Sequence, residues 1–174
     1  YIGVSAAIGV ANGTDAIELS LRALDIGVGD EVITVSHTAV ATVAAVEAAG
    51  ASPVLVDVEP QFFTLDSDQL DEVITSKTKA VIAVHLYGQA ANIEVIQAFC
   101  LKHNLFLIED VSQAHGAKYN GRRLGSIGDI ACFSCYPTKN LGAMGDAGLI
   151  TTNNKNLATK IRMLREYGCL LYTS

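Results

Sequence analysis

Residues 80–86 read Ala80-Val-Ile-Ala-Val-His-Leu86, and residues 105–110 read Leu105-Phe-Leu-Ile-Glu-Asp110. Both runs are apolar with little alternation, which is typical of strands in a sheet that is covered on both faces. Between them, residues 93–103 have the apolar spacing of a helix. Strands that alternate with helices in this way favour a mostly parallel sheet with helices packed on it.

The same alternation continues along nearly the whole chain. Further strands are predicted at 7–10, 31–35, 53–58, 130–135 and 148–152, and further helices at 14–24, 38–49, 66–74 and 157–167. No internal repeat, low-complexity stretch or linker interrupts the pattern. The sequence therefore predicts one α/β domain with three layers (α/β/α) and a mostly parallel sheet of about seven strands.

The composition narrows the class of protein. Half of the 174 residues are hydrophobic and 17% are charged, so there is material for a packed core and little sign of disorder. The formal net charge is −6 and no basic cluster occurs, which argues against nucleic acid or an anionic membrane as a partner. No apolar run reaches the ~18–20 residues of a membrane span, and a cytoplasmic setting is predicted.

Four cysteines occur, at positions 100, 132, 135 and 169, and they do not form a disulfide framework for a chain of this size. Cys132 and Cys135 form a lone C-x-x-C pair on a predicted strand. Residues three apart on a strand point to opposite faces, so one metal ion could not easily bind both. We therefore favour buried small residues over a zinc or redox site, and no metal site is predicted.

Polar residues collect after the ends of the predicted strands. In an open parallel sheet, ligands bind beyond the carboxyl ends of the strands. The groups that follow strands in this way are residues 12–14, 36–38, 85–89, 110–113 and 134–139. Core packing does not require this clustering, so we predict a ligand site at this edge of the sheet.

Lys139 is the only charged residue in the run Ser134-Cys-Tyr-Pro-Thr-Lys-Asn-Leu-Gly-Ala143, which follows an apolar strand. Judged alone, a lysine is most often a solvent-exposed side chain. Burial in uncharged surroundings, however, disfavours the ammonium form and leaves an amine that can attack a carbonyl. From the residues alone, both readings stay open.

Asp110 closes the strand at 105–110, and it is either a turn residue or a functional carboxylate. A pyridoxal phosphate enzyme needs an amine for a Schiff base and an anion for the pyridinium nitrogen. Lys139 and Asp110 could supply this pair, and Gln113 could bridge to a phenolic oxygen. His115 fits a packed core histidine better than a ligand.

Gly13 and Thr14 begin a predicted helix directly after a strand. The free N–H groups of a helix start, together with a threonine hydroxyl, favour a phosphate group, and Ser134 could add a second hydroxyl. Thr14 is equally suited to cap the helix, so the pair alone is a weak signal. The sequence has neither a P-loop nor a Gly-x-Gly-x-x-Gly dinucleotide motif.

Seven segments give a more specific signal through their order and spacing. They are Asn12-Gly-Thr-Asp-Ala16, Gly29-Asp-Glu-Val-Ile33, Ser36-His-Thr-Ala-Val-Ala-Thr42, His85-Leu-Tyr-Gly-Gln89, Glu109-Asp-Val-Ser-Gln-Ala-His-Gly-Ala117, Gly125-Ser-Ile-Gly-Asp129 and Phe133-Ser-Cys-Tyr-Pro-Thr-Lys-Asn-Leu-Gly142. Together they closely resemble the DegT/StrS sugar aminotransferases, a branch of the fold-type-I pyridoxal phosphate enzymes. The likeness covers residues 1 to about 168.

The resemblance implies the catalytic residues. Lys139 would bind pyridoxal 5'-phosphate as a Schiff base and then move the proton between substrate carbon and cofactor. Asp110 would pair with the pyridinium nitrogen and keep it protonated. A related branch of the family has histidine in place of the lysine and acts as a dehydratase, so Lys139 points to an aminotransferase.

The resemblance also implies the residues that bind the cofactor. Gln113 would contact the phenolic oxygen of the ring. Many members have an aromatic residue after Thr38 that stacks on the ring, but this chain has Ala39, and the hypothesis is that His37 covers the ring instead. The residues that would hold the phosphate are Gly13, Thr14 and Ser134.

By the same resemblance, the reaction takes an amino group from glutamate or glutamine and gives it to a keto sugar carried on a nucleotide diphosphate. The 36–42 segment looks most like members that aminate C3 of a dTDP-keto-6-deoxyhexose. The full-length protein would be a homodimer whose neighbouring subunit completes the pocket. Two alternatives stay open: a non-catalytic or regulatory pyridoxal phosphate protein of the same fold, and a cofactor-free α/β binding domain.

The resemblance places residues 1–168 in the cofactor-binding large domain. Because the chain starts at Tyr1 in mid-pattern, we expect this domain to be truncated at its N-terminus and to lack the C-terminal small domain. Residues 169–174 continue no visible pattern and are expected to be a non-native tail.

Overall fold

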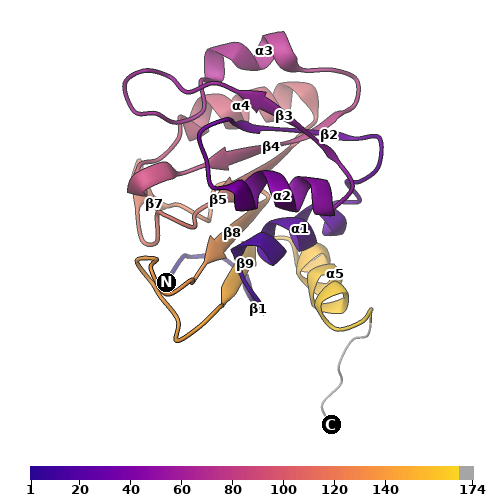
Figure 1. Cartoon of the computed structure of the whole chain (residues 1–174), viewed down its shortest axis with the longest axis vertical. Coiled ribbons are helices and arrows are strands. Elements are labelled where there is room, and N and C mark those ends of the chain that lie inside the picture. The colour runs from indigo at the N-terminus through magenta and orange to yellow at the C-terminus, as the bar shows by residue number, and fades with distance from the viewer. Residues whose placement is uncertain (169–174) are drawn as a thin grey trace.

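The computed structural model describes residues 1–168, and the expected tail at 169–174 lies outside the described residues. Seven strands form the main sheet in the order β1-β9-β8-β5-β4-β2-β3 (Figure 1). Their bounds are Ala6–Val10 (β1), Glu31–Val35 (β2), Ser52–Val56 (β3), Thr78–Val84 (β4), Phe106–Asp110 (β5), Ile130–Ser134 (β8) and Gly148–Thr152 (β9).

The sheet is parallel except around β9. β2 pairs in parallel with β3 and β4, and β5 pairs in parallel with β4 and β8. β9 is antiparallel to both of its neighbours, β1 and β8, so β1 runs in the same direction as the five parallel strands. The predicted mostly parallel, seven-stranded α/β sheet is confirmed.

Helices cover both faces of the sheet. The helices are α1 (Gly13–Ala23), α2 (Val40–Ala48), α3 (Leu70–Val73), α4 (Ile93–His103) and α5 (Lys155–Arg165), with short 3-10 turns η1 (Ser67–Gln69) and η2 (Leu86–Gly88). α1 contacts both α2 and α5, while α4 packs on β4 and β5 from behind the sheet (Figure 1). Right-handed crossovers explain this division, because the β1-to-β2 and β4-to-β5 connections run in opposite directions along the sheet.

The central strands are apolar throughout because both of their faces are covered. Val81, Ile82 and Ala83 of β4 are consecutive, and all three are fully buried. In a strand that had one solvent-facing side, every second residue would be exposed. The unbroken apolar runs in the sequence therefore correspond to the middle layer of a three-layer domain.

The main departures from the predicted elements are two helices and one hairpin that was not predicted. The helix predicted at 66–74 is a 3-10 turn followed by the single turn α3. The Asp66 side chain caps the 3-10 turn by accepting the N–H of Asp68, and the backbone of Ile74 is already extended. The helix predicted from residue 38 starts at Val40, since Ala39 is extended. A small hairpin, β6 (Lys118–Tyr119) with β7 (Arg122–Arg123), was not predicted.

The buried-residue reading of the cysteines is confirmed. Cys100, Cys132 and Cys135 are all buried free thiols. Burial raises the pKa of Cys132, and it raises the pKa of Cys100 to about 12, so neither is a ready thiolate. In residues 1–168, His, Cys, Asp and Glu side chains form no group of three that could hold a metal ion. Nor does this part of the chain contain a helix long and apolar enough to span a bilayer.

Candidate active site

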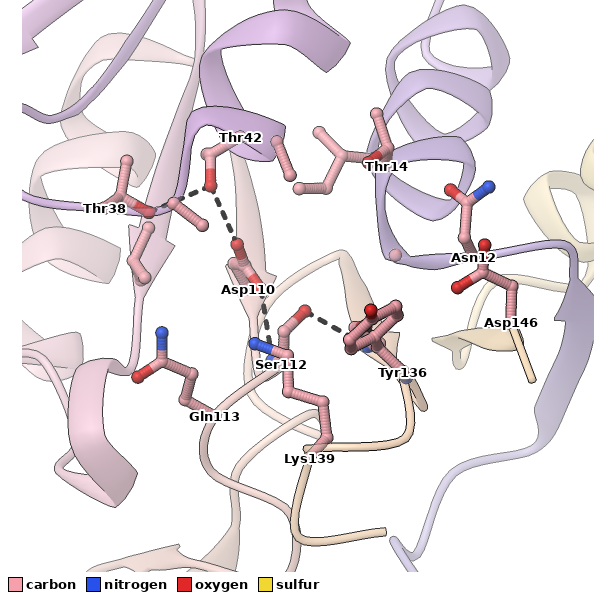
Figure 2. A pocket seen from close by; sticks show the side chains of 16 residues that line it. Asn12, Thr14, Thr38, Thr42, Asp110, Ser112, Gln113, Tyr136, Lys139 and Asp146 are labelled. Atoms are coloured by element: carbon pink, nitrogen blue, oxygen red, sulfur yellow. Dashed lines mark hydrogen bonds between the residues drawn. The ribbon is translucent and has the colours of Figure 1, made fainter. Parts of the chain in front are cut away.

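A cavity of about 360 Å³ lies beyond the carboxyl ends of the strands (Figure 2). Its lining comes from the segments that follow β1, β2, β5 and β8, together with the end of β4. The lining residues are Asn12, Gly13, Thr14, Ile17, Thr38, Ala39, Ala41, Thr42, Val84, Asp110, Ser112, Gln113, Ser134, Tyr136, Lys139 and Asp146. Six of the seven site residues predicted from the sequence therefore meet in one cavity.

The start of α1 forms one end of this cavity. Asn12 caps the helix, because its Oδ1 accepts the N–H of Asp15 at 2.7 Å. Thr14 is thus not the N-cap, and its hydroxyl has no hydrogen-bond partner among the described residues. A Cβ on Gly13 would lie 2.6 Å from the Cβ of Ser134, so only glycine lets the helix start approach the end of β8 this closely.

Asp110 lies in the centre of the sheet edge and is 5% exposed. Its Oδ1 accepts the N–H of Ser112 at 3.1 Å, and its Oδ2 accepts the hydroxyl of Thr42 at 3.1 Å. Thr38 lies 2.9 Å from the Thr42 hydroxyl. Since Thr42 has one hydroxyl proton, which it gives to the carboxylate, Thr38 donates to Thr42 (Figure 2).

Thr42 was not predicted as a site residue. Thr38 and Thr42 lie four positions apart around the start of α2, a spacing that places side chains on one face. That spacing was the signal in the sequence that could have pointed to Thr42. The sequence alone does not give the strand order, which places the start of α2 beside the end of β5.

Lys139 is placed by a tight turn directly after β8. Pro137 occupies the second position of this turn, which the Lys139 N–H closes by donating to the Tyr136 carbonyl at 2.8 Å. The N–H of Ser134 donates to the Ser112 hydroxyl at 3.1 Å, which ties the end of β8 to the segment after β5. The Lys139 side chain is half-buried, and no carboxylate of residues 1–168 forms an ion pair with it.

Gln113 has a defined orientation. Its Oε1 accepts the backbone N–H of Tyr87 at 3.1 Å. The amide NH₂ is therefore left to donate, and Gln113 lines the cavity (Figure 2). This orientation suits an oxygen acceptor in the cavity.

The two histidines near the site lie differently from each other. His37 is exposed and is not among the lining residues, and its Nε2 lies 3.1 Å from the hydroxyl of Tyr87. Its contact with a cofactor ring stays a prediction. His115 packs beside Phe133 with ring centroids 5.7 Å apart. Burial lowers the pKa of His115, and the charge of Lys139 acts in the same direction.

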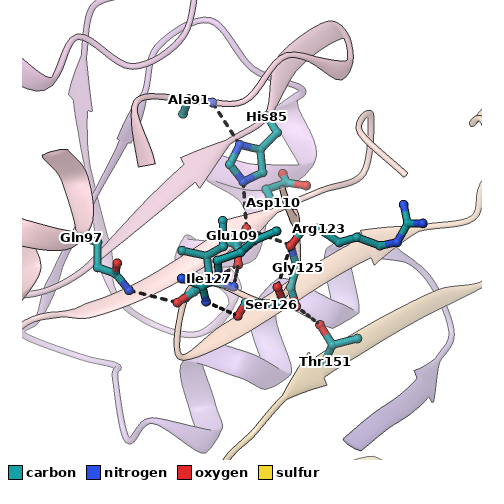
Figure 3. Close-up of polar contacts among 12 residues, drawn as sticks. His85, Ala91, Gln97, Glu109, Asp110, Arg123, Gly125, Ser126, Ile127 and Thr151 are labelled. Carbon is teal, nitrogen blue, oxygen red and sulfur yellow. Dashed lines mark hydrogen bonds and ion pairs between the residues drawn. The ribbon is translucent and has the colours of Figure 1, made fainter. Parts of the chain in front are cut away.

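Behind Asp110, the carboxylate of Glu109 is fully buried (Figure 3). Its Oε1 accepts the N–H groups of Ile127 and Gly128 at 2.8 Å, and its Oε2 accepts that of Gly125 at 2.8 Å. His85 Nδ1 accepts the N–H of Ala91, so the ring proton lies on Nε2 and donates to Glu109 at 3.1 Å. His85 therefore belongs to the core and not to the edge of the sheet.

This network ties the site-bearing strands together. Consecutive residues of a strand point to opposite faces, so Glu109 is anchored on one side while Asp110 is presented on the other. Glu109 joins the end of β5 to the segment after β4 and to the loop before β8. Burial alone would raise the pKa of Glu109, but the bond from His85 and the backbone donors outweigh it and lower the pKa.

We expect Glu109→Gln to destabilise the fold by about 3 kcal/mol at pH 7, because the amide leaves buried N–H donors without acceptors. The folded-state pKa of Glu109 lies below its ordinary value of 4.5. Its contribution is therefore complete above that value and disappears as the pH falls through the folded-state pKa. Urea unfolding at pH 7 and in acid measures this.

The control for Glu109→Gln is Glu47→Gln, at an exposed position of α2. The difference in the free energy of unfolding between wild type and Glu109→Gln should become smaller in acid, whereas the control should match wild type at every pH. If this difference does not change with pH, the charge of Glu109 does not contribute to stability.

Comparisons with known proteins agree on one family. The family model described as DegT/DnrJ/EryC1/StrS aminotransferase family matches residues 1–173. A dTDP-3-amino-3,6-dideoxy-alpha-D-galactopyranose transaminase of Aneurinibacillus thermoaerophilus is 54% identical over 97% of this chain and 46% of its own length. A pleiotropic regulatory protein of Geobacillus stearothermophilus is 51% identical over 92% of this chain and 43% of its own length.

Solved structures give the same result. The crystal structure of S. venezuelae DesV in complex with a ketimine intermediate superposes with a TM-score of 0.96 at 46% identity, over 100% of this chain and 47% of that chain. NtdA from Bacillus subtilis with bound cofactor PMP gives a TM-score of 0.88 at 39% identity, over 94% of this chain and 37% of that chain. This chain therefore spans less than half the length of the relatives it matches.

Proposed function

The chain belongs to the DegT/DnrJ/EryC1/StrS aminotransferase family, and from this premise we propose that its cavity binds pyridoxal 5'-phosphate. We propose further that the whole protein transfers an amino group to a keto sugar carried on a nucleotide diphosphate. The observation that carries the proposal is that Lys139, Asp110 and the start of α1 line one cavity, although they are far apart in sequence.

The residues present fit this cofactor. Gly13 lets the start of α1 approach Ser134, because a Cβ there would lie 2.6 Å from the Ser134 Cβ. The N–H groups of Gly13 and Thr14, which Asn12 does not cap, are then left for a phosphate. A pyridinium nitrogen requires an anion as its partner, and Asp110 supplies a carboxylate that two hydrogen bonds hold in place. Gln113 has free amide hydrogens for an oxygen of the ring. His37 keeps its predicted role beside the ring only as a hypothesis.

Each residue then has a chemical task. Pyridoxal phosphate, when bound, supplies an electron sink for the carbon that loses or gains the amino group. The Nζ of Lys139 would hold the cofactor covalently and would move the proton at the reacting carbon once it is free. The carboxylate of Asp110 would keep a proton on the ring nitrogen. Thr42 and Ser112 fix the direction in which that carboxylate points.

The amino acceptor is proposed from the relatives. The names of the A. thermoaerophilus relative and of a 46% identical Streptomyces venezuelae relative are both those of dTDP-3-amino sugar transaminases. We therefore propose amination at C3 of a dTDP-keto-6-deoxyhexose. Glutamate or glutamine as the donor, and a cytoplasmic setting, remain predictions from the sequence.

A homodimer is part of the proposal. Beside the cavity, the chain around Lys139 exposes large apolar side chains: Tyr136 is 52% exposed, Leu141 is 57% exposed and Met144 is fully exposed. Exposed apolar side chains that cluster beside a site favour a surface that a second subunit covers. The neighbouring subunit would then close the cavity over the cofactor.

A second function has a specific observation in its favour. The relative from G. stearothermophilus bears the name of a pleiotropic regulatory protein at 51% identity, which fits a regulatory protein that uses the same fold. The test is to load the full-length protein with pyridoxamine phosphate and add dTDP-keto sugars. An aminotransferase converts the cofactor, which changes its absorbance, whereas a regulatory protein binds the sugar and leaves the absorbance unchanged.

We expect Thr42→Val to raise the dissociation constant for pyridoxal phosphate about tenfold, because the carboxylate of Asp110 loses the hydroxyl that orients it. Thr42→Ser should restore the affinity. Equilibrium dialysis of the full-length protein measures both values.

The matched control for Thr42→Val is Thr34→Val. Thr34 is equally buried, but its hydroxyl donates to the Ile82 carbonyl at 3.2 Å, away from the cavity. Both valine variants should lose thermal stability, but only Thr42→Val should lose cofactor affinity. Equal affinities in the two variants would mean that Thr42 serves packing alone.

A further inference from the structure

The segment 85–91 follows β4 and contacts a residue that lines the cofactor cavity. The backbone N–H of Tyr87 donates to the Oε1 of Gln113 at 3.1 Å, which leaves the amide NH₂ of Gln113 for the cavity. The direction in which Gln113 points therefore depends on where the segment holds the N–H of Tyr87.

Tyr87 has an unusual backbone conformation. Its φ of 56° and ψ of 21° lie in the left-handed region, which is uncommon for a residue other than glycine. The residue is 64% exposed, so burial of the ring does not explain why this conformation is kept. A strained backbone conformation persists only where the surrounding structure fixes it. Its cause is therefore to be found in the bonds that hold segment 85–91.

His85 supplies such bonds, because all three of its nitrogen atoms form hydrogen bonds and the residue is fully buried. Its backbone N–H donates to the Asp110 carbonyl at 3.0 Å, and its Nδ1 accepts the N–H of Ala91 at 3.1 Å. Its Nε2 donates to Glu109 at 3.1 Å (Figure 3). The imidazole thus joins the first and last residues of segment 85–91, and it fixes the closed segment to β5.

Building on the proposed function, in which Gln113 donates to the phenolic oxygen of the cofactor ring, we infer that His85 is a positioning residue for Gln113. The Nδ1 of His85 closes the segment into a loop, and the closed loop keeps Tyr87 in its left-handed conformation. The N–H of Tyr87 then fixes the amide of Gln113. Without this donor, the amide is free to turn its oxygen, which cannot donate, toward the ring.

Two amide substitutions separate the two contacts of the His85 ring. In His85→Asn, the side-chain oxygen takes the place of Nδ1, so the N–H of Ala91 keeps an acceptor while the bond to Glu109 is lost. In His85→Gln, the amide nitrogen takes the place of Nε2, so the bond to Glu109 stays and the N–H of Ala91 loses its acceptor. Each variant removes one buried hydrogen bond, so both should lose stability to a similar extent.

The first measurement is hydrogen exchange in full-length protein without cofactor, followed by mass spectrometry. In His85→Gln the amides of residues 85–91 should exchange about tenfold faster because the loop is no longer closed, whereas His85→Asn should stay within about threefold of wild type. His103→Gln, at a partly exposed histidine at the end of α4, is the control and should match wild type. Equal exchange of this segment in both His85 variants would show that Nδ1 does not close the loop, whether or not the protein binds a cofactor.

The second measurement is the pH at which the absorbance of bound pyridoxal phosphate changes. The NH₂ group of Gln113 favours negative charge on the phenolic oxygen, so loss of this donor should raise that pH by about half a unit to one unit. Gln113→Leu and His85→Gln should each show the increase, and His85→Asn should not. The double variant of His85→Gln with Gln113→Leu should shift no further than Gln113→Leu alone, since both changes remove the same contact.

Three outcomes of this titration would overturn the assignment. Shifts that add in the double variant would show that His85 acts independently of Gln113. A His85→Gln variant that titrates as wild type does would show that the closed loop does not orient the amide. A Gln113→Leu variant without a shift would show that Gln113 does not donate to the ring. If the wild type binds no pyridoxal phosphate, the proposed function fails, and the role of His85 toward the cofactor fails with it, even where hydrogen exchange shows the closed loop.

Discussion

Lys139→Ala is expected to lower the rate of amino transfer by at least about 10⁴-fold, because it removes both the covalent anchor of the cofactor and the base that moves the proton. The variant should still fold, since the Lys139 side chain is only half-buried and its N–H bond to Tyr136 comes from the backbone. Stopped-flow absorbance with a dTDP-amino sugar measures the rate. Borohydride reduction should attach the cofactor to the wild type and leave the variant unmodified.

Lys77→Ala is the matched control for this experiment. Lys77 is an exposed lysine in the turn before β4, and it is not among the residues that line the cofactor cavity. The control should transfer the amino group at the wild-type rate, and borohydride should attach the cofactor to it as it does to the wild type. A Lys139→Ala variant that keeps a tenth or more of the wild-type rate would show that another group supplies the amine.

Asp110→Asn should lower amino transfer on the order of 10³-fold or more, while the fold stays intact. The amide has the shape of the carboxylate but cannot supply the negative charge that keeps the ring nitrogen protonated. Its oxygen can still accept one of the two present donors, the Ser112 N–H or the Thr42 hydroxyl. The Thr42 hydroxyl can rotate to meet the new NH₂ group, so the structural cost is small. Single-turnover rates and thermal melting together separate the two effects.

The control for Asp110→Asn is Asp129→Asn. Like Asp110, Asp129 accepts a hydrogen bond from the backbone, because its Oδ2 accepts the N–H of Leu107 at 2.9 Å. Asp129 is not among the residues that line the cofactor cavity. This variant should lose some stability and keep its rate. If Asp110→Asn reacts at a rate near that of wild type, the electrostatic role assigned to the carboxylate is wrong.

The sequence predicted the regular elements well because their signals are local. Strands Glu31–Val35 and Gly148–Thr152 and helix Ile93–His103 have the predicted bounds. The hairpin at 118–123 was missed because each strand has only two residues, too few for an alternating pattern. Its turn residues, Asn120 and Gly121, both have positive φ, as a two-residue hairpin loop requires.

Lys139 and Asp110 were selected because an amine and a carboxylate follow apolar strands, although the residues alone left a structural reading open for each. The family resemblance supplied their roles, and the structure places both residues in one cavity. Thr42 could not be selected, because its contact with Asp110 depends on the strand order, which no local pattern indicates. Glu109 lies next to Asp110, yet strand alternation sends its side chain to the other face, into a network visible only in the structure.

The placement of one flat ring between Lys139 and Asp110 is tested most directly by a crystal structure of the full-length protein with pyridoxal phosphate bound. We expect continuous density from the Lys139 Nζ to the cofactor, and the Asp110 carboxylate within hydrogen-bond distance of the ring nitrogen. Density that joins the cofactor to a different lysine, or a ring nitrogen turned away from Asp110, would contradict the account.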